Sequence, residues 1–384
     1  MRSFFRNYRF IEIIYILSAL IITAQRYFLG HYNNFTIFRY STIHFFQKTD
    51  LYGLHPDEYY DLFLYSPTFA LMFAPFSFLP VLIGICLWVF FVMAVYYYSI
   101  RVLPFERKWI LFIFGFTFIE LVTSVENLQT NPLIAAFIVL TFVYLEKDKI
   151  IKASIFPVLG FFIKVYGIIS GVLLILKRPN FKTVLYFAGW FTLFLLLPLI
   201  YYSPAGLVDL YKQWKISLFS DHEINTGISL MGILAGIFRI KTGLVWIQVT
   251  GLSFLLITLT SVFIRKNFEQ VRELVLAYIM IWVVIFNHDA ESATYIIAVT
   301  GVAIWYVQSS RSITDKILLS LTFVFTVLSP TDIFPDYVYR KFVLPYSLKA
   351  LGPSLIWLKI QMSLFLPAKK SPGNEHKEAN LTDF

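Results

Sequence analysis

The sequence predicts an all-α, polytopic membrane protein with about twelve transmembrane or re-entrant helices. Hydrophobic residues make up 58% of the chain and charged residues only 14%, whereas soluble domains carry about 25% charge. The mean hydropathy is +0.70. Apolar runs long enough to cross about 30 Å of hydrocarbon recur along the whole length. The lone Cys86 lies in one of these runs, so the sequence offers no disulfide framework.

The apolar runs define the expected spans. In order, these cover residues 10–29, 81–102, 109–124, 132–146, 153–163, 167–176, 183–202, 243–264, 274–287, 293–309, 317–329 and 346–366. No small-residue cleavage site follows the first run, so we interpret it as a retained helix rather than a signal peptide. We expect one membrane-embedded domain over residues 1–366 and a polar, disordered cytoplasmic tail over residues 367–384.

Some of these segments are too short to cross a bilayer alone. Residues 153–163 and 167–176 predict a broken pair of helices that dips into the bilayer around Lys164. Discontinuous helices of this kind often point at a binding site. The stretch 229–238 is also short and predicts a helix along the outer interface.

The distribution of charge predicts the orientation. Arg2, Arg6 and Arg9 precede the first span, and the positive-inside rule places them in the cytoplasm. Following the spans from there, the other basic turns fall on the same side and the acidic segments on the opposite side. We therefore expect a multi-pass protein of a bacterial cytoplasmic membrane with both termini in the cytoplasm. The net charge of +9 follows this alternation and does not indicate a nucleic-acid partner.

A large loop, residues 30–80, follows the first span on the expected outer side. Phe35, Phe38, Phe45 and Phe46 recur near helical spacing, which predicts a helix in the plane of the interface. The acids of the loop are Asp50, Asp57, Glu58 and Asp61. A partly buried carboxylate with a raised pKa could take a proton from a hydroxyl group, although most loop acids are solvated or paired with bases. A large loop with aromatic residues and carboxylates next to the first span indicates an enzyme that acts at the membrane surface.

Lys164 lies in the apolar segment FFIKVYG. A lysine near the middle of a bilayer costs about 2.5–3.5 kcal/mol, so it needs a partner or a wet cavity. A point charge on a flexible stem suits the phosphate of a lipid carrier. The alternative is a lysine that snorkels from the outer end of a short span.

Two outer segments combine histidine with acids. His288 and Glu291 directly follow a span, which makes them candidates to line a cavity, or else to form a hydrogen-bonded cap. The segment 221–223 (Asp-His-Glu) falls on the same side. Neither has the spacing of a defined metal motif, so we expect no metal site and no cofactor.

The outer turn SVENLQTNP offers Gln129 and Asn131 as polar groups that could bind a sugar. Asn131 precedes Pro132, and asparagine at a helix cap before proline is also ordinary capping chemistry. Both roles stay open for this turn.

Taken in order, short elements of the chain resemble those of glycosyltransferase family 87, also called domain of unknown function 2029, which includes polyprenol-phosphate-mannose-dependent mannosyltransferases. The elements are Asn33-Asn34-Phe35, Asp50-Leu51-Tyr52, Tyr65-Ser66-Pro67, Leu79-Pro80 with Trp88, Gln129-Thr130-Asn131, and Lys164. Order and spacing are similar over roughly residues 10–180.

The resemblance implies a membrane enzyme of the GT-C type whose active site faces away from the cytoplasm. It implies a hexosyltransferase, with mannose as a candidate sugar, that takes a polyprenyl-phosphate sugar as donor. The acceptor would be a lipid or a glycan, and membrane lipids would surround the reaction. The expected substrate-binding residues are Asn33, Asn34, Arg39, Tyr52, Tyr65, Gln129, Asn131 and Lys164. Of these, Lys164 and Arg39 would stabilise charge on the departing phosphate.

One departure from the family concerns the catalytic base. The aspartate expected just after the first span is replaced by Asn33-Asn34, and an amide cannot accept the acceptor's proton. We expect another acid to substitute. The catalytic candidates are Asp50, Asp57, His288 and Glu291. The alternatives are altered or lost activity, or a non-catalytic scaffolding role.

A rival function from another class is a transporter or lipid flippase, with a translocation site at the broken helices around Lys164. Transporters place coupling carboxylates within spans, whereas nearly all acids of this chain lie in outer loops. Glu120 lies within a span and is the exception. The enzyme is therefore the favoured interpretation.

Overall fold

The computed structural model describes residues 8–220, 226–239 and 245–365. Every regular element in these three ranges is a helix, as the sequence predicts. The first half of the chain forms α1 (Tyr8–Leu29), α2 (Asn33–Gln47), α3 (Pro67–Met72), α4 (Ala74–Ser77), α5 (Val81–Arg101), α6 (Arg107–Glu126), α7 (Asn131–Glu146), α8 (Ile150–Ile163), η1 (Val165–Ser170), α9 (Gly171–Lys177) and α10 (Phe181–Leu196). The second half forms η2 (Leu197–Ile200), α11 (Pro204–Ser220), α12 (Leu230–Phe238), α13 (Val245–Arg265), α14 (Phe268–Ile285), η3 (Ser292–Thr294), α15 (Tyr295–Gln308), α16 (Ile313–Thr322), η4 (Phe323–Leu328), α17 (Asp336–Val338), η5 (Tyr339–Val343), η6 (Leu348–Ala350) and α18 (Leu351–Phe365).

Five helices of the described residues are long and apolar enough to cross a membrane. They are α1, α5, α6, α13, and α10 continued by η2. Shorter apolar helices accompany them: α7, α8, η1 continued by α9, and η3 continued by α15. Each expected span coincides with a helix or with adjoining helices, and the short helix expected at 229–238 is α12. These findings support an integral membrane protein. The tail, residues 367–384, lies outside the described residues.

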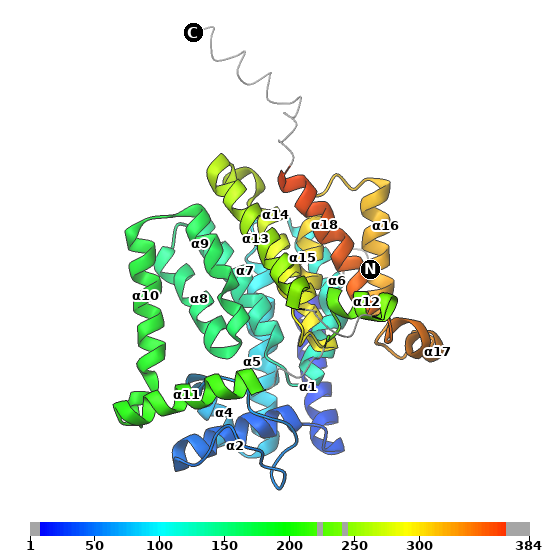
Figure 1. Cartoon of the computed structure of the whole chain (residues 1–384). Helices are drawn as coiled ribbons and strands as arrows, with labels where there is room; N and C mark the ends of the chain where they lie inside the picture. Colours follow the sequence, from blue (N-terminus) through cyan, green and yellow to red (C-terminus); the bar gives the residue numbers. More distant parts are fainter. Residues whose placement is uncertain (1–7, 221–225, 240–244, 366–384) are drawn as a thin grey trace.

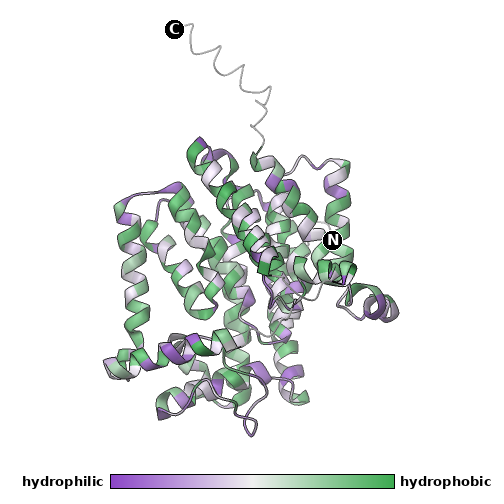
Figure 2. Ribbon diagram, in the orientation of Figure 1, coloured by the Kyte–Doolittle hydropathy of each residue, from purple (hydrophilic) through white to green (hydrophobic). Residues whose placement is uncertain are grey.

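The long helices run side by side, and α2 and α11 lie across one end of the bundle (Figure 1). We call this the α2 end. Most residues of α7, α14 and α15 are buried, so these three helices form the interior. Hydrophobic residues cover most of the helices, while hydrophilic ones gather at the turns and at the α2 end (Figure 2). Helices packed in lipid are held by close van der Waals contact and by polar contacts between them.

The first loop forms much of the α2 end. The predicted helix around Phe35 to Phe46 is confirmed as α2, with Phe35, Phe38 and Phe45 buried. Lys48 follows the last residue of α2, and its left-handed φ of 58° turns the chain back. The loop then follows an irregular path to Ser66. The Ser66 hydroxyl accepts a hydrogen bond from Phe69 N and caps α3, which fixes where the loop rejoins the bundle.

Candidate active site

A helix break lies at Lys164, between α8 and η1. Its backbone is extended (φ −137°, ψ 124°), and Gly167 N then donates to Lys164 O at 2.7 Å. The helices on either side of the break, α8 and η1, come into contact at two glycines. A Cβ atom on Gly160 would lie only 2.8 Å from Gly167 O. The predicted broken pair of helices is therefore present, and the absence of side chains at Gly160 and Gly167 lets its arms meet.

The Lys164 ammonium is directed at polar groups of the protein. Nζ donates to Asn131 Oδ1 at 3.1 Å, and the Tyr166 hydroxyl donates to the same oxygen at 3.0 Å. Nζ also lies 6.0 Å from the ring centroid of Tyr65 and 5.9 Å from that of Tyr166, within cation–π range. These partners come from α7, the first loop and η1. The contacts favour a built cation site over a lysine that snorkels.

Asn131 is the first residue of α7, and the helix cap is Thr130. The expected capping role for Asn131 is wrong, because no side-chain oxygen caps this helix. The Asn131 side chain is instead buried and turned to Lys164 and Tyr166. A residue distant in the sequence stabilises the turn before α7: Trp88 Nε1 donates to Leu128 O at 3.1 Å. Predicted elements far apart in the chain thus meet at this turn.

Two carboxylates from the turn between α14 and η3 lie within electrostatic range of this lysine. The charges of Glu291 and Asp289 lie close enough to act on the Lys164 ammonium. Glu291 Oε2 accepts from Gln129 Nε2 at 3.3 Å, and Asp289 Oδ2 lies 3.0 Å from His288 Nε2. Glu291 is also the N-cap of η3: its side chain accepts from Thr294 N, and its backbone N donates to Thr294 Oγ1 at 3.2 Å, so the hydrogen-bonded cap left open by the sequence is present. Because its side chain is exposed, a substrate hydroxyl could reach it.

Tyr65 brings the first loop onto this group. Its hydroxyl lies 3.3 Å from Thr130 Oγ1, and its backbone oxygen accepts from the Tyr52 hydroxyl at 3.1 Å. The neighbouring Ser66 donates to Phe162 O at 2.5 Å, just before the break. Burial raises the pKa of the Tyr65 phenol well above its usual value, so the phenol stays neutral and can donate to a substrate oxygen. The Lys164 cluster, as we define it, comprises Lys164, Tyr65, Gln129, Asn131, Tyr166 and Glu291.

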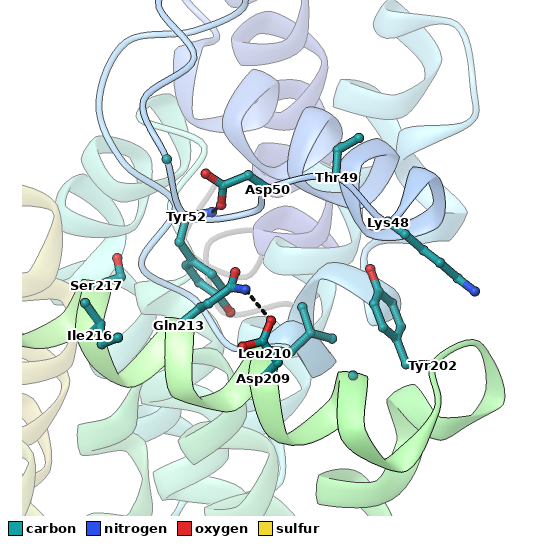
Figure 3. Close-up of a pocket in the computed structure, with 12 residues that line it drawn as sticks. Lys48, Thr49, Asp50, Tyr52, Tyr202, Asp209, Leu210, Gln213, Ile216 and Ser217 are labelled. Carbon is teal, nitrogen blue, oxygen red and sulfur yellow. Dashed lines mark hydrogen bonds between the residues drawn. The ribbon is translucent and has the colours of Figure 1, made fainter.

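Asp50 and Tyr52 line a pocket of about 570 Å³ between the first loop and α11 (Figure 3). Asp50 Oδ1 accepts from Tyr52 N at 2.9 Å, which holds the carboxylate at the pocket wall. On the α11 side, Gln213 Nε2 donates to Asp209 Oδ2 at 2.6 Å. Carboxylate and amide groups of this kind can hydrogen-bond sugar hydroxyls. Tyr52 lines the pocket and contacts Tyr65, so the pocket adjoins the Lys164 cluster.

A separate cavity of about 850 Å³ collects four other predicted site residues, namely Asn33, Asn34, Arg39 and Asp57. None of the Lys164 cluster lines this cavity. The Asn33 side chain is engaged with the Tyr60 backbone, donating to Tyr60 O at 2.8 Å and accepting from Tyr60 N at 3.0 Å. Arg39 donates to Leu79 O at 2.8 Å. The structure therefore gives Asn33 and Arg39 contacts to the backbone and does not bring these four residues to Lys164.

The sequence interpretation missed a buried ion pair next to the site. Lys349 Nζ donates to Glu120 Oε1 and to Ser292 Oγ, at 2.8 Å each. Both charged side chains are buried. Because Ser292 follows Glu291, this pair anchors the turn that carries the Glu291 carboxylate. The apolar surroundings of Glu120 signalled the need for a partner, but the partner lies 229 positions away. The candidate segment 221–223 lies outside the described residues.

Comparison with known proteins adds one finding. The sequence model of glycosyltransferase family 87 matches residues 63–330. The matched range includes Tyr65, Lys164 and Glu291 but begins after Asn33 and Asp50. No curated protein matches the chain. The match therefore covers every residue of the Lys164 cluster, whereas residues 30–62 of the first loop lie outside it.

Proposed function

This chain belongs to glycosyltransferase family 87, and from that premise we propose that it transfers a hexose from a polyprenyl-phosphate sugar to a lipid or glycan acceptor. Mannose is the first candidate sugar. Family membership makes the chain a membrane glycosyltransferase. The observation that carries the finer proposal is the Lys164 ammonium, held by Asn131 and within electrostatic range of Glu291. A donor that carries a phosphate requires a cation to bind it, and an acceptor hydroxyl requires a base to remove its proton. The Lys164 cluster contains both a cation and a carboxylate.

In the proposed reaction, the acceptor hydroxyl oxygen attacks C1 of the donor sugar and forms the new glycosidic bond. The bond from C1 to the phosphate oxygen breaks, and polyprenyl phosphate leaves with the electron pair. Lys164 stabilises the charge that develops on that phosphate. The proton of the hydroxyl passes to a carboxylate. No strong general acid is required, because the phosphate is already a good leaving group.

Glu291 is the carboxylate that we assign as the base. It is exposed, its charge acts on Lys164, and Gln129 donates to its side chain. Asp50 in the adjoining pocket is the second candidate. Asp57 is disfavoured because it lines the separate cavity. His288 lies beside Asp289, where it supports the turn that carries Glu291.

We place the α2 end on the extracytoplasmic side, with both termini in the cytoplasm and about twelve transmembrane or re-entrant helices. The turns at the other end of the bundle hold Arg101, Lys147, Arg178, Arg265 and Arg311. A concentration of basic residues at one end supports this orientation through the positive-inside rule. A bacterial cytoplasmic membrane fits such a topology and a polyprenyl-phosphate donor.

The test is a transfer assay with the purified full chain in liposomes, radiolabelled polyprenyl-phosphate mannose and membrane-lipid acceptors. Lys164→Ala is expected to lower kcat by about 10²–10³, the usual effect of losing one group that stabilises developing charge. Lys182→Ala removes an exposed lysine of α10 and serves as the matched control, with transfer unchanged. If Lys164→Ala transferred sugar at the rate of the control, Lys164 would not be the group that stabilises the phosphate.

A second pair of variants assigns the base. Glu291→Gln is expected to lower kcat by about 10²–10⁴, as for loss of a general base, whereas Asp50→Asn should act mainly on KM. The reverse pattern would move the base to Asp50. The transporter alternative gains no support, since Glu120 is occupied by Lys349. Solute flux in liposomes, together with no sugar transfer from any lipid donor, would favour the transporter alternative.

A further inference from the structure

His44, His55 and Glu58 come together at the α2 end, apart from the Lys164 cluster. The potential ligand atoms of the three side chains all lie within 4.8 Å of one another. The His44 and His55 ring centroids are 4.3 Å apart, and His44 Nε2 lies 3.0 Å from Glu58 Oε2. Two imidazoles and one carboxylate converge here from α2 and from the loop that follows it.

The backbone explains why these side chains converge. His44 lies in the last turn of α2 and is buried. After the chain reverses, Glu58 N and Tyr59 N both donate to His55 O, at 2.9 Å and 3.0 Å, and form a single helical turn. Residues three apart on one turn present their side chains on the same face, so His55 and Glu58 point together. The sequence HPDE was interpreted only as a source of acids, and this spacing was missed.

The hydrogen-bond partner of His55 determines which of its ring nitrogens can bind a metal ion. His55 Nε2 lies 3.1 Å from the Asp50 carbonyl oxygen, which can only accept, so Nε2 carries the proton and Nδ1 keeps a lone pair. Such a contact to a backbone carbonyl is how ligating histidines are normally oriented. Glu58 Oε2 is buried and lies 3.0 Å from His44 Nε2, a contact that a shared metal ion would replace. His44 Nδ1 is also buried and has no hydrogen-bond partner among the described residues.

We propose that His44, His55 and Glu58 bind one divalent transition-metal ion of the Zn²⁺ type. Zinc takes imidazole and carboxylate ligands at about 2.0–2.2 Å, which places neighbouring ligand atoms about 3.3 Å apart. Rotation of the half-buried His55 and Glu58 side chains would close the present spacing. Mg²⁺ and Ca²⁺ prefer oxygen ligands alone, so two imidazoles disfavour them. Three protein ligands leave a fourth position for water or a substrate oxygen.

The ion would tie the middle of the first loop to α2. Through His55 it would also hold the Asp50 carbonyl, and the next residues carry Tyr52, whose hydroxyl reaches Tyr65 of the Lys164 cluster. The proposed role is therefore to stabilise the loop that forms the pocket of Figure 3. This role stands whether or not the sugar-transfer proposal holds.

The test uses the purified full chain without a polyhistidine tag, stripped with EDTA and titrated with Co²⁺ and then with Zn²⁺. We expect one Co²⁺ per chain, with the visible absorbance of a four- or five-coordinate site, displaced by Zn²⁺. His55→Ala and Glu58→Gln should each weaken Co²⁺ binding by about 100-fold or more. His31→Ala removes an exposed histidine of the same loop and is the matched control.

Thermal unfolding gives a second measurement that does not depend on enzymatic activity and that shows whether each variant is folded. Zn²⁺ should raise the Tm of the unmodified chain and of His31→Ala, because an ion that binds only the folded chain stabilises it. Without metal, His55→Ala and Glu58→Gln should unfold at the Tm of the metal-free unmodified chain, which shows that they are folded. No saturable Co²⁺ absorbance in the unmodified chain would overturn the proposal. Binding by Glu58→Gln as tight as by His31→Ala would also overturn it.

Discussion

Replacing Lys349 by Met is expected to lower the free energy of unfolding by about 3–5 kcal/mol, the usual effect of removing one partner from a buried ion pair. The structure supports the upper part of this range. Glu120 has an exposed fraction of 0% and Lys349 of 3%, so water cannot replace the lost ammonium. Glu120 Oε2 already lacks a hydrogen-bond partner among the described residues, and Oε1 would lose its contact at 2.8 Å. The variant would leave a carboxylate buried and unpaired.

The double variant Glu120→Met with Lys349→Met removes both charges and should recover most of the lost stability, because apolar side chains of similar volume replace a buried pair with little penalty. The four chains form a double-mutant cycle, whose coupling free energy isolates the pair. Unfolding in detergent micelles can be followed by tryptophan fluorescence. Lys341→Met, at an exposed lysine of η5, is the control and should stay within about 0.5 kcal/mol of the unmodified chain.

The reasoning about the buried pair fails if Lys349→Met is no less stable than Lys341→Met. It also fails if the double variant is as unstable as Lys349→Met alone, since the two charges would then not depend on each other. The same chains test the link to the site. Lys349 also holds Ser292, next to Glu291, so residual transfer in a folded Lys349→Met chain should be slower than in Lys341→Met.

Two further predictions concern the helix break and the first loop. Gly167→Ala is expected to destabilise the chain by about 1–3 kcal/mol, because the new Cβ would lie 2.6 Å from Gly160 Cα. Gly115→Ala, where nothing lies within 4 Å, should be neutral or slightly stabilising in the same fluorescence assay, and equal losses would contradict the close contact. Asn33→Asp should lower stability by about 0.5–1.5 kcal/mol, because Tyr60 O loses its donor. Its transfer should be no faster than that of the unmodified chain, and faster transfer would return the catalytic base to this position.

The positions of the helices could be predicted because long apolar runs leave few alternatives in lipid. Details set by tertiary contacts could not. The expected span 317–329 is divided between α16 and the π-helix η4. There, Thr326 Oγ1 donates to Lys349 O at 2.6 Å, across 23 residues of sequence. A hydropathy pattern does not show such a contact. The last helix also differs from its prediction, because it begins at Leu351 and not at residue 346.

The proximity of the candidate residues could be predicted best where they lie at helix ends. Gln129, Asn131 and Lys164 lie at the ends of α7 and α8, so the order of the spans alone brings them to one end of the bundle. The first loop is different, because the path of an irregular chain depends on contacts that no local pattern encodes. Asp57 and Arg39 lie in the same loop as Tyr65, yet they line the separate cavity. The convergence of His44 with Glu58 escaped prediction for the same reason.

In the proposed reaction, Asn33 cannot take the proton of the acceptor hydroxyl. Its amide donates to and accepts from the Tyr60 backbone, and a carboxylate could only accept. The amide is thus matched to holding the loop against α2. A base at this position would in any case lie in the separate cavity, away from Lys164. Glu291 acts electrostatically on Lys164 from the turn before α15 and accepts a hydrogen bond from Gln129, so the proposed cation and base come near one another because the two halves of the bundle pack together at the α2 end.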